Sequence, residues 1–116
     1  MLLGESPSPF GHELAGTVAA VGPGVEGFSP GMRVVAANSA PCDDCWFCAK
    51  DQPQLCDSLK LHNGAYADYN LVPARIARRN LYELPPGLDF AAAALTEPLA
   101  CAIHACEVLQ TRAGEV

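Results

Sequence analysis

Apolar residues in the first half of the chain gather in short runs that glycine and proline separate. Residues 14–21 are almost all apolar and end at Gly22-Pro23-Gly24, which predicts a buried strand stopped by a turn. A second strand is expected over residues 33–37, after the turn at Ser29-Pro30-Gly31. Many short strands with this punctuation are typical of a barrel-like β fold.

Two further segments extend the β pattern. Residues 65–72 alternate between two faces and follow Asn63-Gly64, a dipeptide that favours a hairpin turn. Residues 81–84 predict one more short strand, which Pro85-Pro86-Gly87 ends. We therefore expect a mainly β domain up to this point.

The pattern becomes helical after Gly87. Asp89 is a suitable N-cap for a short helix over residues 90–94, and Thr96 could cap a second helix that ends near Gly114. Apolar residues recur in the second helix at spacings of three and four, which predicts one apolar stripe. The stripe comprises Leu99, Ala102, Ile103, Cys106 and Leu109. We expect Cys101 and Cys106 to be buried thiols on it.

Composition limits the possible function. The chain has 116 residues, half of them apolar, which suits one domain spanning residues 1–116. Its formal charge of −6 argues against a nucleic-acid partner, and it has no apolar run of the roughly 20 residues that cross a membrane. The first residues do not resemble a secretory signal, so the six cysteines indicate a reducing, cytoplasmic setting.

Four of these cysteines lie between residues 42 and 56, with the spacing C-x2-C-x2-C-x7-C. Such spacing lets four thiolates converge on one Zn²⁺ in a tetrahedral, structural site with no position open to substrate. Two disulfides are the alternative, and they are disfavoured because disulfide scaffolds belong mainly to secreted chains. The ligands of the predicted zinc lobe are Cys42, Cys45, Cys48 and Cys56.

Several motifs together resemble the zinc-dependent medium-chain alcohol and polyol dehydrogenases, and in particular the sorbitol and threonine dehydrogenase branch. Besides the cysteine spacing, the motifs are Gly11-His12-Glu13-x2-Gly16-x5-Gly22-x2-Val25 with Phe28, Gly31 and Arg33-Val34, then Gly64-Ala65-Tyr66-Ala67-Asp68-Tyr69, and finally Glu97-Pro98-Leu99-Ala100. They follow the order in which the family has them. The resemblance implies a GroES-like, partly open β-barrel domain.

The same resemblance implies a second zinc site, which is catalytic. It makes His12, Glu13 and Glu97 the catalytic and metal-binding residues, and it implies oxidation of a small alcohol or polyol to a carbonyl with NAD or NADP. For the full-length enzyme it implies a homo-oligomer. On a regular strand His12 and Glu13 would point to opposite faces, so both could bind one metal only if the backbone bends.

The residues also have simpler interpretations. His12 and Glu13 could form an ordinary hydrogen-bonded pair, and Glu97 could be a carboxylate that the dipole at a helix start favours. A non-catalytic structural zinc module is therefore an alternative function, and a barrel that binds partners, as chaperonin cofactors do, is a further one.

The chain also departs from the family pattern. The family's first catalytic ligand is a cysteine upstream of Gly-His-Glu, and the ten residues before Gly11 contain none. Asp51 stands where the family usually has glycine in the cysteine loop, and Asp tolerates left-handed backbone geometry. No βαβ unit with the G-x-G-x-x-G turn of a Rossmann domain is predicted. We therefore expect a domain truncated at both ends, lacking the Rossmann domain and inactive as an isolated chain.

Overall fold

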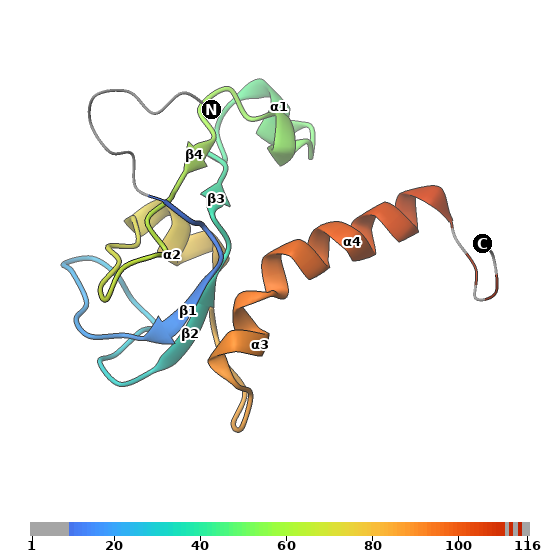
Figure 1. Cartoon of the computed structure of the whole chain (residues 1–116). Coiled ribbons are helices and arrows are strands. Elements are labelled where there is room, and N and C mark those ends of the chain that lie inside the picture. Colours follow the sequence, from blue (N-terminus) through green and yellow to red (C-terminus); the bar gives the residue numbers. More distant parts are fainter. Residues whose placement is uncertain (1–9, 111, 113, 115–116) are drawn as a thin grey trace.

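A computed structural model describes residues 10–110, 112 and 114. Its main sheet has three antiparallel strands in the order β1 (Leu14–Thr17), β2 (Arg33–Ala36) and β5 (Leu81–Glu83) (Figure 1). Val35 in the central strand is paired with Ala15 on one side and with Tyr82 on the other. The strands expected at 14–21, 33–37 and 81–84 are thus confirmed, although each is shorter than predicted.

The first strand shows why the apolar run overstated its length. Beyond Thr17, Val18 still donates to Met32 O and accepts from the amide of Gly31, both at 2.8 Å. Ala19 and Ala20 are exposed and pair with no strand in the described part of the chain. Small apolar residues therefore continued the pattern into the turn without continuing the sheet.

A second, two-stranded sheet was not predicted. It pairs β3 (Ser39–Ala40) with β4 (Lys60–Leu61), and Ser39 lies opposite Leu61. The intervening residues 41–59 leave the body as a lobe that contains α1 (Trp46–Ala49) and the short 3-10 helix η1 (Pro53–Leu55). The lobe is seen at the top of Figure 1, and the two strands hold its ends together.

The strand predicted over residues 65–72 is wrong, and so is the hairpin at Asn63-Gly64. Residues 65–72 form no strand or helix, and Tyr69 and Leu71 are strongly exposed. Strand β4 pairs with β3, and residues 65–72 pair with neither of the two described sheets. Alternation alone cannot supply that partner, which is why the pattern was misleading here.

Helix α2 (Ala74–Asn80) was missed. It begins directly after Pro73, whose fixed φ suits a helix start, and it buries only Ile76 and Ala77. Two adjacent apolar residues give no helical periodicity, so the sequence carried little signal for it.

The core lies between the three-stranded sheet and α3 (Phe90–Ala94). Val35, Leu84 and Ala93 are its buried residues, and Leu88 and Phe90 pack against them. The predicted cap is confirmed, because Asp89 Oδ2 accepts hydrogen bonds from the amides of Ala91 and Ala92. Helix α3 is therefore fixed against β1 and β2.

Helix α4 (Thr96–Leu109) follows at once and extends away from the sheet (Figure 1). The predicted cap at Thr96 is wrong, since its hydroxyl donates to Ala93 O at 2.7 Å and Thr96 is the first helical residue. The helix ends at Leu109, before Gly114, and the following residue, Gln110, caps it with left-handed geometry. Its apolar stripe is exposed, and the expectation that Cys101 and Cys106 are buried is also wrong.

Among the described residues, no helix combines the length and the apolar character that crossing a membrane requires.

Candidate zinc sites

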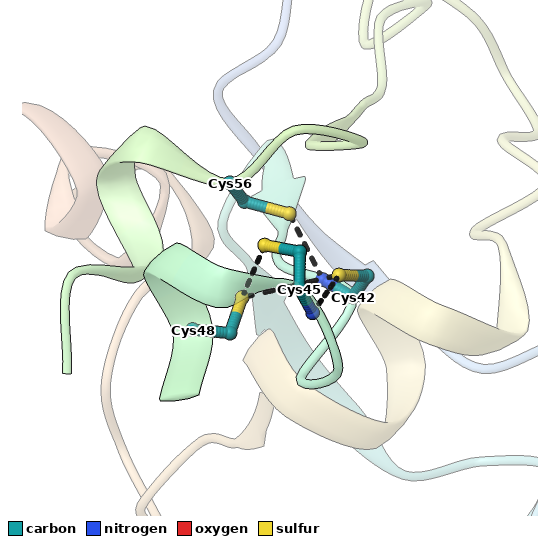
Figure 2. A group of neighbouring side chains, drawn as sticks. All are labelled: Cys42, Cys45, Cys48 and Cys56. Atoms are coloured by element: carbon teal, nitrogen blue, oxygen red, sulfur yellow. Dashed lines mark hydrogen bonds between the residues drawn. The ribbon is translucent and has the colours of Figure 1, made fainter. Parts of the chain in front are cut away.

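The cysteine lobe brings four sulfur atoms together. The Sγ atoms of Cys42, Cys45, Cys48 and Cys56 all lie within 4.8 Å of one another, with Cys45 and Cys48 3.5 Å apart and Cys42 and Cys48 3.9 Å apart (Figure 2). A tetrahedron with the Zn–S distance of zinc thiolates has sulfurs about 3.8 Å apart. The four residues therefore suit a structural zinc ion.

The disulfide alternative fails on the same distances. A disulfide needs sulfurs about 2.0 Å apart, whereas Cys45 and Cys48 lie 3.5 Å apart, and none of the four cysteines of the lobe is in a disulfide.

The local chain explains why the sulfurs converge. The amide of Cys42 donates to Cys56 Sγ at 3.2 Å, and the amide of Cys45 donates to Cys42 Sγ at 3.3 Å. Asp43 and Asp51 adopt left-handed geometry, with φ of 65° and 57°. Asp51 thus has the conformation that glycine favours, and its amide donates to Cys48 O at 3.1 Å.

The thiols of the lobe also differ in pKa. Hydrogen bonds from the backbone amides of Asp44 and Cys45 lower the pKa of Cys42 to about 6. The amide of Cys48 lowers the pKa of Cys45, whereas burial, with hydrogen bonding to Cys45, raises the pKa of Cys48 to about 11. One thiolate is therefore already favoured at neutral pH, and metal binding must displace protons from others.

A second group of metal-binding side chains lies in the body of the domain. One ligand atom each from His12, Glu13 and Glu97 lies within 4.8 Å of the other two. His12 and Glu13 immediately precede β1, and Glu97 lies in the first turn of α4. Helix α3 packs against β1 and leads directly into α4, which brings Glu97 to the start of the strand.

The backbone accommodates the two adjacent residues of this cluster. Strand β1 begins only at Leu14, and Gly11 has a φ of 78°, so His12 and Glu13 do not lie on a regular strand. The rule that neighbouring side chains point to opposite faces therefore does not apply to them, and their ligand atoms lie in one cluster. A Cβ atom at position 11 would lie 2.5 Å from the Tyr66 ring, so glycine is required there for space as well.

A cleft of about 390 Å³ adjoins the cluster. His12 and Glu13 line it together with Phe10, Tyr66 and Ala94. The rings of Phe10 and Tyr66 stack with their centroids 5.2 Å apart and form an apolar wall. Sequence reasoning did not assign this wall, because residues 65–72 were expected to form a strand.

Three other polar residues occupy different positions. Cys101 Sγ lies 3.9 Å from Glu97 Oε1, a proximity that the spacing of four residues on one helix could have indicated. His62 is hydrogen bonded to Asn70. His104 lies on exposed α4, 3.9 Å from Glu107, and takes no part in either cluster.

Comparison with known proteins agrees with the motifs. The family described as the alcohol dehydrogenase GroES-like domain matches residues 2–86. The chain is 37% identical over 113 residues to 2-dehydro-3-deoxy-L-galactonate 5-dehydrogenase of Pseudoalteromonas atlantica, covering 94% of this chain and 32% of that protein. It is 35% identical over 116 residues to sorbitol dehydrogenase of Halalkalibacterium halodurans, covering 96% and 33%.

Solved structures give the same result. Galactitol-1-phosphate dehydrogenase from Escherichia coli superposes with a TM-score of 0.78 at 30% identity, covering 90% of this chain and 30% of that one. The chain thus spans about a third of the length of the relatives that it matches.

Proposed function

This chain belongs to the family of alcohol dehydrogenase GroES-like domains, and from this premise we propose that it is the catalytic-domain portion of a zinc-dependent alcohol or polyol dehydrogenase. The reaction is the oxidation of a secondary alcohol or polyol to a carbonyl, with NAD or NADP as the hydride acceptor. Residues 1–116 form the GroES-like domain, and residues 42–56 form its structural zinc lobe.

The observation that carries this proposal is the cluster of His12, Glu13 and Glu97 beside an open cleft. An imidazole and two carboxylates are donors that zinc accepts, and three protein ligands leave a coordination position for substrate. When bound, zinc supplies the Lewis acidity that lowers the pKa of an alcohol oxygen. The donor set therefore suits a catalytic site, in contrast to the four sulfurs of the lobe.

The residues of the cluster have separable roles. His12 binds as a neutral imidazole, and Glu13 binds beside it because both residues precede the regular strand β1 and their ligand atoms cluster. Glu97 either binds the metal directly or accepts a hydrogen bond from a group bound to the metal. The helix dipole at the first turn of α4 stabilises its negative charge.

The cleft supports the substrate class. The stacked rings of Phe10 and Tyr66 offer an apolar surface against which the carbon chain of a polyol packs. The relatives named above act on sugar-derived compounds by their names, and a small polyol is the substrate that we propose for this chain. A homo-oligomeric state and a cytoplasmic location stay predictions.

Metal titration of the purified chain tests the proposal. We expect two equivalents of Zn²⁺ or Co²⁺, one that resists mild chelation and a second, looser one that His12→Ala abolishes. A single equivalent, unaffected by His12→Ala, would instead support the alternative of a non-catalytic zinc module. The G-x-G-x-x-G sequence at residues 22–27 joins the antiparallel strands β1 and β2, so it is not the strand-to-helix turn of a βαβ unit. We therefore expect no polyol oxidation by this chain alone with either nicotinamide cofactor.

A further inference from the structure

The backbone just before His12 is held by a turn from a distant part of the chain. The amides of Gly64 and Ala65 both donate to Gly11 O, at 2.8 and 3.1 Å, and the amide of Tyr66 donates to Phe10 O at 3.2 Å. Ala65 and Tyr66 also line the cleft. The position of this turn therefore affects both the residue preceding His12 and one wall of the cleft.

Secondary structure does not fix this turn. Residues 62–73 contain no helix or strand, and Tyr66, Tyr69 and Leu71 are exposed by 79%, 83% and 89%. So little apolar burial leaves the turn dependent on polar contacts for its position.

Two partly buried side chains supply those contacts. Asn70 Nδ2 donates to Gly64 O at 2.8 Å, and Asn70 Oδ1 is hydrogen bonded to His62 Nε2. The amide of His62 donates to Asn38 O at 2.8 Å, next to the two-stranded sheet. A continuous series of hydrogen bonds thus connects that sheet to Gly11.

The chemistry of the carbonyl at Gly64 defines the orientation of the pair. Because a carbonyl only accepts, the amide nitrogen of Asn70 must face Gly64, and its oxygen must accept from His62. His62 therefore carries hydrogen on Nε2, as either the neutral or the charged ring allows. Among possible substitutions of His62, glutamine best preserves a side-chain N–H donor toward Asn70 Oδ1.

We propose that Asn70, oriented by His62, is a positioning residue for the metal-binding segment at His12. The proposal rests on the proposed function, because it assumes a metal held by His12, Glu13 and Glu97. Asn70 is not among the residues that line the cleft; it holds Gly64, whose amide in turn holds Gly11 O. Metal sites depend on such supporting hydrogen bonds, since ligand atoms displaced by about 1 Å no longer converge.

Cobalt binding to the second site, with zinc retained in the lobe, tests the proposal. We expect Asn70→Ala to weaken this binding by about 10- to 100-fold, as loss of supporting contacts around a metal does. His62→Ala should weaken it similarly, and His62→Gln should restore most of the affinity. A merely destabilising change would not be rescued in this way.

Asn80 provides the matched control. Its Nδ2 likewise donates to a backbone carbonyl, Ser39 O, at 2.6 Å, and it is also partly buried. Asn80→Ala should leave cobalt binding at the second site unchanged. Equal effects of Asn70→Ala and Asn80→Ala would overturn the positioning role.

Amide hydrogen exchange keeps the test independent of metal. Asn70→Ala should accelerate exchange at Gly64 and Ala65, whose amides hold Gly11, while the amides of the three-stranded sheet stay protected. If the wild-type chain bound no second metal, the proposed function would fail and with it the role toward a metal. Unchanged exchange rates in Asn70→Ala would show that Asn70 does not hold the turn at Gly64 and Ala65, and the positioning role would then be overturned whether or not the metal binds.

Discussion

The two candidate metal sites are built in opposite ways. The lobe takes its four ligands from one continuous stretch, residues 42–56, and amides of the same stretch donate hydrogen bonds to its sulfurs. The second cluster joins His12 to Glu97, so it exists only where the sheet, α3 and the start of α4 are already packed together. One site can shape its own surroundings, whereas the other depends on the whole domain.

Chemistry follows the same division. Four sulfurs close the lobe to substrate, and Cys56 is buried there. His12 and Glu13 are exposed and line a cleft. We infer that the lobe contributes stability and that the cluster contributes reactivity, and each prediction below tests one side of this contrast.

The largest effect is expected from Cys48→Ser. Because structural zinc binding is coupled to folding, loss of one thiolate should release the tight zinc equivalent and lower the free energy of unfolding by several kcal/mol. Zinc content and urea denaturation measure both effects. Cys106→Ser, an exposed position on α4, is the control and should retain the metal. Full zinc content in Cys48→Ser would show that the lobe is not a four-sulfur site.

His12→Ala should affect only the other site. Removal of one ligand out of three should weaken cobalt binding there by at least about 100-fold, while the tight equivalent in the lobe is unchanged. Cobalt titration monitored by absorbance distinguishes the sites, since thiolate ligands give charge-transfer bands that a nitrogen and oxygen site lacks. A simultaneous loss of the lobe metal would mean that the two sites are not independent.

This contrast also explains how much the sequence could predict. The four ligands of the lobe were predicted from cysteine spacing, because they are close along the chain, whereas its helices and the two-stranded sheet at its base were not predicted. The cluster came from a family resemblance, since nothing local connects Glu97 with His12. A departure from regular strand geometry at His12 and Glu13 was posed as a condition, and the structure shows that β1 begins only at Leu14.

The fold was predicted to a similar, uneven extent. The strand around Val35, which is buried on both faces, was predicted correctly because a run of apolar residues marks it. The cap at Asp89 was predicted correctly because the capping residue lies next to the helix that it caps. The strand predicted over residues 65–72 was wrong because a strand needs a partner strand, which alternation alone does not indicate. Helix α2 was missed because it buries only two adjacent residues. The exposed stripe of α4 shows that periodicity indicates an apolar face without showing what covers it.

Acidity within the lobe gives the third prediction. With a pKa of about 6, Cys42 is mostly thiolate at pH 7, whereas Cys48, at about 11, is protonated. In metal-free protein, iodoacetamide should therefore label Cys42 at least about tenfold faster than Cys48 at neutral pH. Mass spectrometry of short labelling times measures the ratio, and bound zinc should suppress both reactions.

The pH dependence has a definite sign. The folded pKa of Cys42 lies below its ordinary value of 9.0, so its thiolate contributes stability to the metal-free lobe that is complete above pH 9. This contribution is lost as the pH falls through about 6, and labelling of Cys42 should slow over the same range. Equal labelling of the two cysteines from pH 6 to pH 8 would contradict the division of acidity.

A smaller effect is expected from Asp89→Ala. Loss of the cap on α3 should cost about 1 kcal/mol of the free energy of unfolding, and it should weaken cobalt binding at the second cluster because α3 positions Glu97. Asp89→Asn keeps a capping oxygen and is the matched control. The zinc content of the lobe should be the same in both variants and in the wild type. Loss of this zinc in Asp89→Ala alone would show that the lobe depends on the body.

The smallest effect concerns the connection between the lobe and the body. Arg79 Nη2 lies 3.0 Å from Asp43 Oδ1, and both side chains are about half exposed. Arg75 makes a second connection by donating to Ser58 O at 2.8 Å. Since an exposed ion pair stabilises by no more than about 1 kcal/mol, Arg79→Ala should change stability slightly and leave zinc binding intact.

A double-mutant cycle isolates this pair. Asp43 has a φ of 65°, so alanine there would add backbone strain, and Asp43→Asn is the better partner for Arg79→Ala. Arg78→Ala, the neighbouring exposed arginine, controls for loss of charge. The coupling energy should be a few tenths of a kcal/mol and should fall further at high salt. A large coupling energy that does not fall at high salt would mean that the body holds the lobe rigidly. The structure of the lobe would then depend on the body and not only on residues 42–56.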